Sequence, residues 1–349
     1  MTHFDPWRLL LDKVAKNGGF VNAHAHFDRA YTVTEENLDD VVYDKLHKKW
    51  LYVDRYKESA TMNQYCKNIQ AALSDQQAMG VTSCLSFIDV DSVVSLKALR
   101  AAGLAKQYAE GIGVNFKIAT QTLKGIVSPY ERIFLEMALD TGVVDIIGSL
   151  PGADAGLEDN HLDIIFQLAK RYKKRIHVHV DQLNSPREKE TELLARKTMQ
   201  HGYEGLVTAV HSISLATHPM KYREEVYKMA KDSGLSFIAC PTAWIDSRRT
   251  EVLTPTHNAV TPVDEMIMHD IVVAIGSDNI HDIYKPYSTG DMSVELKFLL
   301  ESTHIYDQDI LVKIATENGL KVMGSYVGEN RLTSNSKGEF TIIEEPDDM

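Results

Sequence analysis

Short β-forming segments alternate with amphipathic segments along most of the chain. Eight runs rich in β-branched and aromatic residues are each followed by a stretch with helical spacing of its apolar positions. Strict β–α alternation predicts a parallel sheet, and eight units in a row favour a closed (β/α)8 TIM barrel, an α/β fold, over an open sheet. The predicted strands are Phe20–His26, Val81–Asp89, Val114–Thr120, Val143–Leu150, Arg175–Asp181, Gly205–Ser212, Leu235–Cys240 and Ile271–Asp278.

Segments with helical periodicity fill the gaps between these strands. Lys and Glu occupy one face and Ala, Leu and Ile the other, which is typical of helices that cover a sheet. The clearest examples are Asn63–Met79, Ser95–Glu110, Ser128–Asp140 and Asp163–Lys173.

We expect residues 1–349 to form one domain. Residues 1–19 make an N-terminal extension with a helix at Pro6–Lys16, residues 20–325 form the barrel, and residues 326–349 form a polar C-terminal tail. This length suits the fold, because such a barrel takes ~250 residues plus insertions.

Charge and cysteine content narrow the setting. The net charge of −12 argues against nucleic acid or an anionic membrane surface as partner. No apolar run approaches the ~20 residues that span a bilayer, and the N-terminus does not read as a signal peptide. The three cysteines show no CxxC spacing and would leave one unpaired, which favours a cytoplasmic location.

Polar residues concentrate at the C-terminal ends of the predicted strands, where barrel enzymes build their sites. Strand one ends with His24 and His26, strand five with His179, strand six with His211 and strand eight with Asp278. Alternate residues on a strand share a face, so both strand-one imidazoles can point into the barrel mouth. Imidazole and carboxylate are common ligands of zinc, iron and manganese, so the set predicts a metal that activates a water.

Two further polar residues on these strands have alternative interpretations. His177 shares the inward face with His179 but lies one layer deeper, so it is either a satisfied core histidine or a partner of a ligand. Asp89 ends strand two and is equally compatible with a structural and a catalytic role. The histidines in predicted helices and loops are expected at the surface or in packing positions: His161, His201, His218, His269 and His304.

Four stretches of the chain resemble the amidohydrolase superfamily, in particular its cytosine deaminase-like branch, which also holds triazine-ring N-alkylamine hydrolases. The matching stretches run in order and are Phe20–Asp28, Ile176–Gln182, Thr208–Ser212 and Gly276–Asp282. The resemblance implies one divalent metal, zinc or iron with manganese also compatible, bound by His24, His26, His179 and Asp278. It also implies that His211 contacts the attacking water or the oxyanion.

The sequence departs from this branch at Gln182. Cytosine deaminases place a glutamate there that carries a proton to the ring nitrogen, whereas an amide cannot titrate. The triazine alkylamine hydrolases also lack that glutamate, so activity is not excluded. The substrate-reading glutamine of the family aligns with Leu123, although Gln121 lies close by.

Two other departures concern the architecture and the number of metal ions. About 19 residues precede strand one, too few for the N-terminal half of the accessory β-sandwich that relatives carry, so we expect a barrel without that domain. Strand four offers no lysine that could be carbamylated to bridge two metals, which favours a single ion.

We therefore predict a metal-dependent amidohydrolase that cleaves a C–N bond of a cyclic or heteroaromatic small molecule. Asp278, His211 and Gln182 are the predicted catalytic residues. The alternative is a catalytically weak relative that binds a small ligand at a metal site; a lactonase-like hydrolase is disfavoured by the missing lysine. A homo-oligomer is compatible with the sequence. The predicted substrate contacts, each equally compatible with a structural role, are Gln182, Asn279, Asp282, Trp244 and Asp246.

Overall fold

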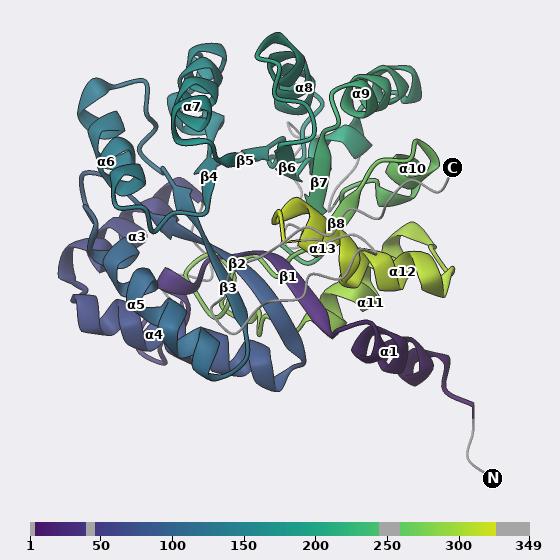
Figure 1. The fold of residues 1–349 in the computed structure, drawn as a ribbon, viewed down its shortest axis with the longest axis horizontal. Helices are drawn as coiled ribbons and strands as arrows, with labels where there is room; N and C mark the ends of the chain where they lie inside the picture. Colours follow the sequence, from purple (N-terminus) through teal and green to yellow (C-terminus); the bar gives the residue numbers. More distant parts are fainter. Residues whose placement is uncertain (1–3, 40–45, 244–258, 326–349) are drawn as a thin grey trace, which may run out of the picture.

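The computed structural model describes residues 4–39, 46–243 and 259–325 as eight parallel strands surrounded by helices (Figure 1). The strands are hydrogen-bonded in sequence order from β1 to β8. Their bounds are β1 Phe20–Ala25, β2 Val81–Asp89, β3 Asn115–Gln121, β4 Ile146–Ser149, β5 Arg175–Val180, β6 Val207–His211, β7 Ser236–Ala239 and β8 Val273–Ile275.

The barrel closes where β1 meets the segment that follows β8. The amide of Asp278 donates to the carbonyl of His24 at 3.0 Å, and the amide of His26 donates to the carbonyl of Asp278 at 3.2 Å. These parallel contacts confirm the predicted (β/α)8 fold. The predicted contacts Trp244 and Asp246 and the predicted tail at 326–349 lie outside the described residues.

Helices form the outer layer of the barrel and connect successive strands (Figure 1). α1 precedes β1 with the predicted bounds, and α11, α12 and α13 follow β8. The helices are α1 Pro6–Lys16, α3 Leu46–Ser59, α4 Met62–Ala78, α5 Lys97–Gly111, α6 Pro129–Asp140, α7 Glu158–Tyr172, α8 Glu190–Gln200, α9 Met220–Asp232, α10 Val263–Met268, α11 Met292–Thr303, α12 Gln308–Ala315 and α13 Glu317–Val322.

Three elements differ from their predicted bounds by three residues or more at one end, and the first of them, β4, begins at Ile146 rather than Val143. β8 ends at Ile275 rather than Asp278, because Gly276 lies against the backbone of β1 and the chain then turns across the barrel mouth. α7 begins at Glu158, five residues before its predicted start, and Glu158 and Asp159 supply the negative charge that favours a first helical turn.

The N-terminal end of the barrel is closed by α13, which lies across it (Figure 1). Nζ of Lys117 donates to the carbonyl of Met323 at 2.8 Å, and Nε2 of His177 lies 2.9 Å from the carbonyl of Val322. His177 is thus a buried core histidine. Above this floor the interior is filled by Val21, Ala23, Leu85, Phe87, Ala119, Ile146, Val210, Ile238 and Ala274.

Among the described residues, no helix combines the length and the apolar composition that crossing a membrane requires. Cys66, Cys84 and Cys240 carry free thiols.

Candidate metal centre

The predicted polar residues meet at the C-terminal mouth of the barrel. His24 lies near the end of β1, His179 near the end of β5 and His211 at the end of β6, whereas His26 and Asp278 follow their strands. All five side chains are almost fully buried, with at most 5% of any residue exposed. Two overlapping groups have ligand atoms within 4.8 Å of one another: His24, His26 and His179, and His24, His211 and Asp278.

Distances within the cluster match those of a small metal site. Oδ1 of Asp278 lies 3.3 Å from Nε2 of His24 and 3.2 Å from Nε2 of His26. Ligand atoms held ~2.0–2.1 Å from a tetrahedral metal are separated by about 3.3 Å. Nε2 of His179 is also buried without a hydrogen-bond partner in the described part of the chain. Such atoms are costly unless something binds them, so the donor set fits a divalent cation.

Burial gives these side chains the protonation states that a metal needs. Desolvation lowers the pKa of His26 and of His179 well below the usual value, so both imidazoles are neutral. For Asp278 burial opposes the charge, but the neighbouring imidazoles of His24 and His26 outweigh it and hold the pKa well below its usual range. Neutral imidazole and ionised carboxylate are the metal-binding forms. Burial also lowers the pKa of His211 to about 4.

Unusual backbone geometry places the residues at the mouth. His211 and Asp278 have φ angles of 75° and 60°, in the left-handed region that side chains other than glycine rarely adopt. Such backbone strain concentrates at functional sites. Close packing adds a second constraint. Only glycine fits at position 276, because a Cβ there would lie 2.6 Å from Cβ of His24.

Phe87 forms the floor of the cluster. Its ring centroid lies 4.6 Å from that of His24 and 4.7 Å from that of His179. The inward position of β4 beside it is Gly148, where a Cβ would lie 2.4 Å from the Phe87 ring and 1.9 Å from the carbonyl oxygen of Thr120. This part of β4 therefore has no room for the lysine that bridges two metals, which supports the expectation of a single ion.

The two residues directly after β5 have different surroundings: Asp181 contacts the start of α8, and Gln182 does not. The carboxylate of Asp181 accepts the amides of Glu190 and Thr191 at 2.7 and 3.1 Å, at the start of α8. Both oxygens of Asp181 are thus engaged outside the barrel. Gln182 is half-buried, and its side-chain amide makes no hydrogen bond to another described residue, so this group is available to a ligand.

Asn279 and Asp282, two predicted substrate contacts, belong to a buried polar network. Nδ2 of Asn279 donates to Oδ2 of Asp282 at 2.5 Å, and Nε of Arg29 lies 3.4 Å from the same oxygen. Nη1 of Arg29 lies 3.3 Å from Oδ1 of Asp89, whose other oxygen lies 3.0 Å from Nζ of Lys57. These contacts support the structural interpretation of Asp89. The substrate roles of Asn279 and Asp282 stay predictions.

Sequence reasoning missed the two buried cations of this network. Arg29 directly follows the strand-one motif, and a cation at the rim among acidic strand ends could have indicated it. Lys57 lies on α3, and nothing in the sequence places it beside Asp89.

Gln121, at the end of β3, and Leu123, in the loop after it, are the two candidates for the position of the family's substrate-reading glutamine. Gln121 is buried, and its Oε1 has no partner among the described residues. Leu123 is half-buried and packs with Val53 of α3 and Ile283 of the loop after β8. Gln121 thus offers an unused polar atom, whereas Leu123 belongs to an apolar contact.

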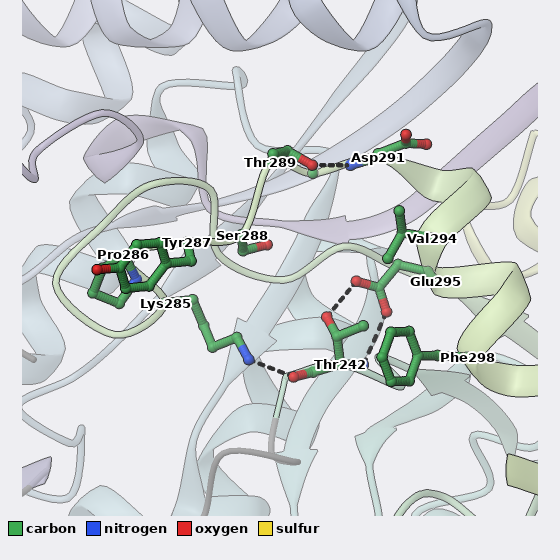
Figure 2. Close-up of a pocket in the computed structure, with 11 residues that line it drawn as sticks. Thr242, Lys285, Pro286, Tyr287, Ser288, Thr289, Asp291, Val294, Glu295 and Phe298 are labelled. Atoms are coloured by element: carbon green, nitrogen blue, oxygen red, sulfur yellow. Dashed lines mark hydrogen bonds between the residues drawn. The ribbon is translucent and has the colours of Figure 1, made fainter.

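A pocket of about 280 Å³ lies between the loop after β8 and the start of α11 (Figure 2). The carboxylate of Glu295 accepts the amide of Thr242 at 3.0 Å and its hydroxyl at 2.5 Å. Nζ of Lys285 donates to the carbonyl of Thr242 (Figure 2). None of the candidate metal ligands lines this pocket.

Known proteins similar to this chain share the part of it that holds the candidate metal ligands. A model of the amidohydrolase family matches residues 18–331. An uncharacterized protein of Haemophilus influenzae is 41% identical over 265 residues, which cover 73% of this chain and 93% of that protein. N-isopropylammelide isopropyl amidohydrolase of Pseudomonas sp. is 28% identical over 325 residues, 88% of this chain and 74% of that protein. The crystal structure of 5-methylcytosine deaminase from Klebsiella pneumoniae liganded with 5-fluorocytosine superimposes with a TM-score of 0.81 at 25% identity, covering 89% of this chain and 75% of that chain.

Proposed function

The chain belongs to the amidohydrolase family, and from this premise we propose that it hydrolyses a ring-attached C–N bond of a heteroaromatic small molecule. The cluster of His24, His26, His179 and Asp278 carries the proposal. Its separations, its burial and its protonation states support a bound divalent metal.

The donor set favours zinc or iron, and manganese is also compatible. When bound, the metal would lower the pKa of a water molecule, so that hydroxide would be available at neutral pH to attack an sp² carbon. His24, His26 and His179 would hold the metal through their ring nitrogens, and Asp278 through its carboxylate.

Asp278 and His211 have separate tasks in the attack of water on the substrate. Asp278, ionised at neutral pH, accepts the proton of the attacking water. His211 is neutral, and its N–H stabilises the oxygen that develops negative charge on the substrate carbon.

The proton for the leaving nitrogen has to come from the same carboxyl group. Gln182 can hold the substrate through its C=O and NH2 but cannot transfer a proton. Asp181, the carboxylate directly after β5, is a second possible proton donor, but both its oxygens accept amides at the start of α8. We therefore assign the protonation of the leaving group to Asp278.

The names of relatives narrow the substrate class. One acts on N-isopropylammelide, another is a 5-methylcytosine deaminase and a third is a pterin deaminase. Their substrates share a nitrogen-rich ring with an exocyclic nitrogen, so we propose such a ring for this chain. Gln182, Asn279 and Asp282 remain the proposed substrate contacts, with Trp244 beyond the described residues. We also keep the cytoplasm as the proposed location.

The test combines metal content with turnover of a panel of aminopyrimidines, pterins and alkylamino-triazines. We expect the metal-replete protein to release ammonia or an alkylamine from at least one of them. The His179→Ala variant should lose both metal and turnover.

A ligand-binding relative without activity is not favoured, because the cluster keeps all four candidate ligands, His24, His26, His179 and Asp278, close together. Metal-replete protein that turned over none of the panel, together with a His179→Ala variant that still bound its ligands, would support that alternative instead.

A further inference from the structure

A serine, a histidine and an aspartate form a hydrogen-bonded chain beside the candidate metal centre. Oγ of Ser149, at the end of β4, lies 2.6 Å from Nε2 of His161 on α7. Nδ1 of His161 lies 2.6 Å from Oδ2 of Asp154, in the short helix that follows β4. Ser149 and His161 are completely buried.

This order of groups is that of a nucleophilic serine, but Ser149 faces away from the barrel interior. On β4, Gly148 faces inward against Phe87, so its neighbour Ser149 faces the helices. Its hydroxyl contacts α7, and no solvent or substrate reaches it. The chain of three groups must therefore act through the protein.

Asp154 fixes the direction of its own hydrogen bond with His161. This carboxylate also accepts the amides of Ile126 and Val127 at 2.7 and 3.2 Å, so it is ionised and can only accept. Nδ1 of His161 must then carry a proton and donate to Asp154. Nε2 of the same ring contacts the hydroxyl of Ser149, so the hydrogen-bonded chain runs from Asp154 through His161 to Ser149.

The other side of the Ser149 peptide faces the metal centre. Its carbonyl oxygen lies 3.3 Å from Nδ1 of His179. A histidine that donates from one ring nitrogen to such a carbonyl presents the lone pair of the other to a metal. Nε2 of His179 is buried and has no partner among the described residues, as this arrangement requires.

We propose that Asp154, His161 and Ser149 are positioning residues that hold the Ser149 carbonyl against His179 and so preset the ring orientation and tautomer of that ligand. The inference rests on the proposed function, because it takes His179 as a metal ligand. The same carboxylate fixes the loop after β3, where a Cβ on Gly125 would lie 2.3 Å from Oδ1 of Asp154.

The test measures binding of the metal alone. Zinc affinity is determined for the full-length protein by competition with a chelator, and the absorption spectrum of the cobalt(II)-loaded protein reports the geometry of the ligands. For Ser149→Ala and for Asp154→Asn we expect zinc binding to weaken by about 10–100-fold and the cobalt spectrum to change.

A matched control destabilises α7 without touching the metal centre. Nζ of Lys197 on α8 contacts Asp159 and Asp163 of α7 at 2.8 and 2.7 Å. Lys197→Met should lower the unfolding temperature and leave zinc affinity and the cobalt spectrum unchanged.

Three outcomes would overturn the proposal. Unchanged zinc affinity and spectrum in both Ser149→Ala and Asp154→Asn would reduce the three residues to a structural role. An equal loss of affinity in Lys197→Met would mean that affinity follows stability. If His179→Ala itself kept full zinc affinity, the proposed metal centre would fail first, and this inference with it.

Discussion

Nε2 of His26 lies 3.2 Å from Oδ1 of Asp278, and the backbones of the same two residues are joined by a hydrogen bond of 3.2 Å. One residue follows the first strand and the other follows the last. The contact that closes the barrel therefore also brings two candidate ligands together. Shape and chemistry are coupled at this point, so a change at Asp278 should affect both.

Asp278→Asn keeps the size of the side chain but removes its charge. We expect turnover to fall by about 10²–10⁴-fold, because an amide cannot accept the proton of the attacking water. Zinc content should fall as well, since the carboxylate is a proposed ligand. Steady-state rates and metal analysis of the purified variant test this. Turnover at the wild-type level would show that another residue is the base.

Gln182→Glu should supply the proton carrier that the deaminase branch has. Gln182 is half-buried and its side chain makes no hydrogen bond to another described residue, so the change breaks no polar contact that the structure shows. We expect release of ammonia from aminopyrimidines to rise by about 10²-fold, with a new dependence on pH. Gln182→Ala is the control and should show neither effect. A variant with full zinc content and no gain in rate would place this residue away from the leaving group.

Gly148→Ala tests the packing beneath the cluster. The new methyl group would lie 2.4 Å from the Phe87 ring and 1.9 Å from the Thr120 carbonyl oxygen, so strand and ring have to shift. Overpacking of this kind costs about 1–3 kcal/mol, and the displaced ring should weaken zinc binding. Urea unfolding and zinc competition measure both effects.

The matched control for that variant is Gly111→Ala on α5, where a Cβ meets nothing within 4 Å. It should leave zinc affinity unchanged and stabilise the protein by up to about 1 kcal/mol, because alanine favours the helix. Equal stability of the two variants would contradict the tight fit described for Gly148.

Arg29→Met should lower the free energy of unfolding, because it breaks the buried polar network. The side chain of Arg29 is only 7% exposed and faces the carboxylates of Asp89 and Asp282. Removal of one partner of a buried ion pair costs about 3–5 kcal/mol. The double variant Arg29→Met with Asp282→Asn should recover part of that loss, because it removes a carboxylate that has lost its partner. Urea unfolding of both variants is the measurement, and no recovery would argue against a direct pairing.

Glu295 gives the protein a stability that depends on pH. Burial raises its pKa to about 7, above the usual carboxyl value. Because the pKa of Glu295 is higher in the folded than in the unfolded protein, the stability that Glu295 contributes is fully present below the unfolded pKa. This contribution is lost as pH rises through about 7. The loss amounts to up to about 3 kcal/mol between pH 5 and pH 8.

Glu295→Gln removes this titration and can keep both contacts with Thr242 (Figure 2). The free energy of unfolding of the variant, relative to the unchanged protein, should therefore improve from pH 5 to pH 8. Urea unfolding at the two pH values tests the sign. A constant difference would show that Glu295 is ionised throughout.

The sequence predicted the barrel and the cluster because both follow from local patterns. Alternation along a strand places His24 and His26 together, and the rule that barrel sites form at strand ends adds His179, His211 and Asp278. α1 begins and ends as predicted, since its capping Asp5 and the glycines after it are local signals.

What the sequence could not predict depends on how separate elements face one another. Lys57 reaches Asp89 only because α3 packs over the end of β2. His161 contacts Ser149 because of the rotation of α7 about its axis, although its position in a helix led to the expectation of a surface or packing residue. A long-range contact between side chains needs a register that no single segment encodes.

The closure between β1 and the segment after β8 also sets an order of assembly in the cell. A ribosome that adds about 5–20 residues per second releases His24 roughly 10–50 s before Asp278. During this interval the growing sheet has an open edge of unpaired strands, and such edges promote aggregation. The metal pocket is complete only when the last strand and the α13 floor have been synthesised. Any metal that the candidate cluster holds can therefore meet its full ligand set only after Asp278 has been synthesised.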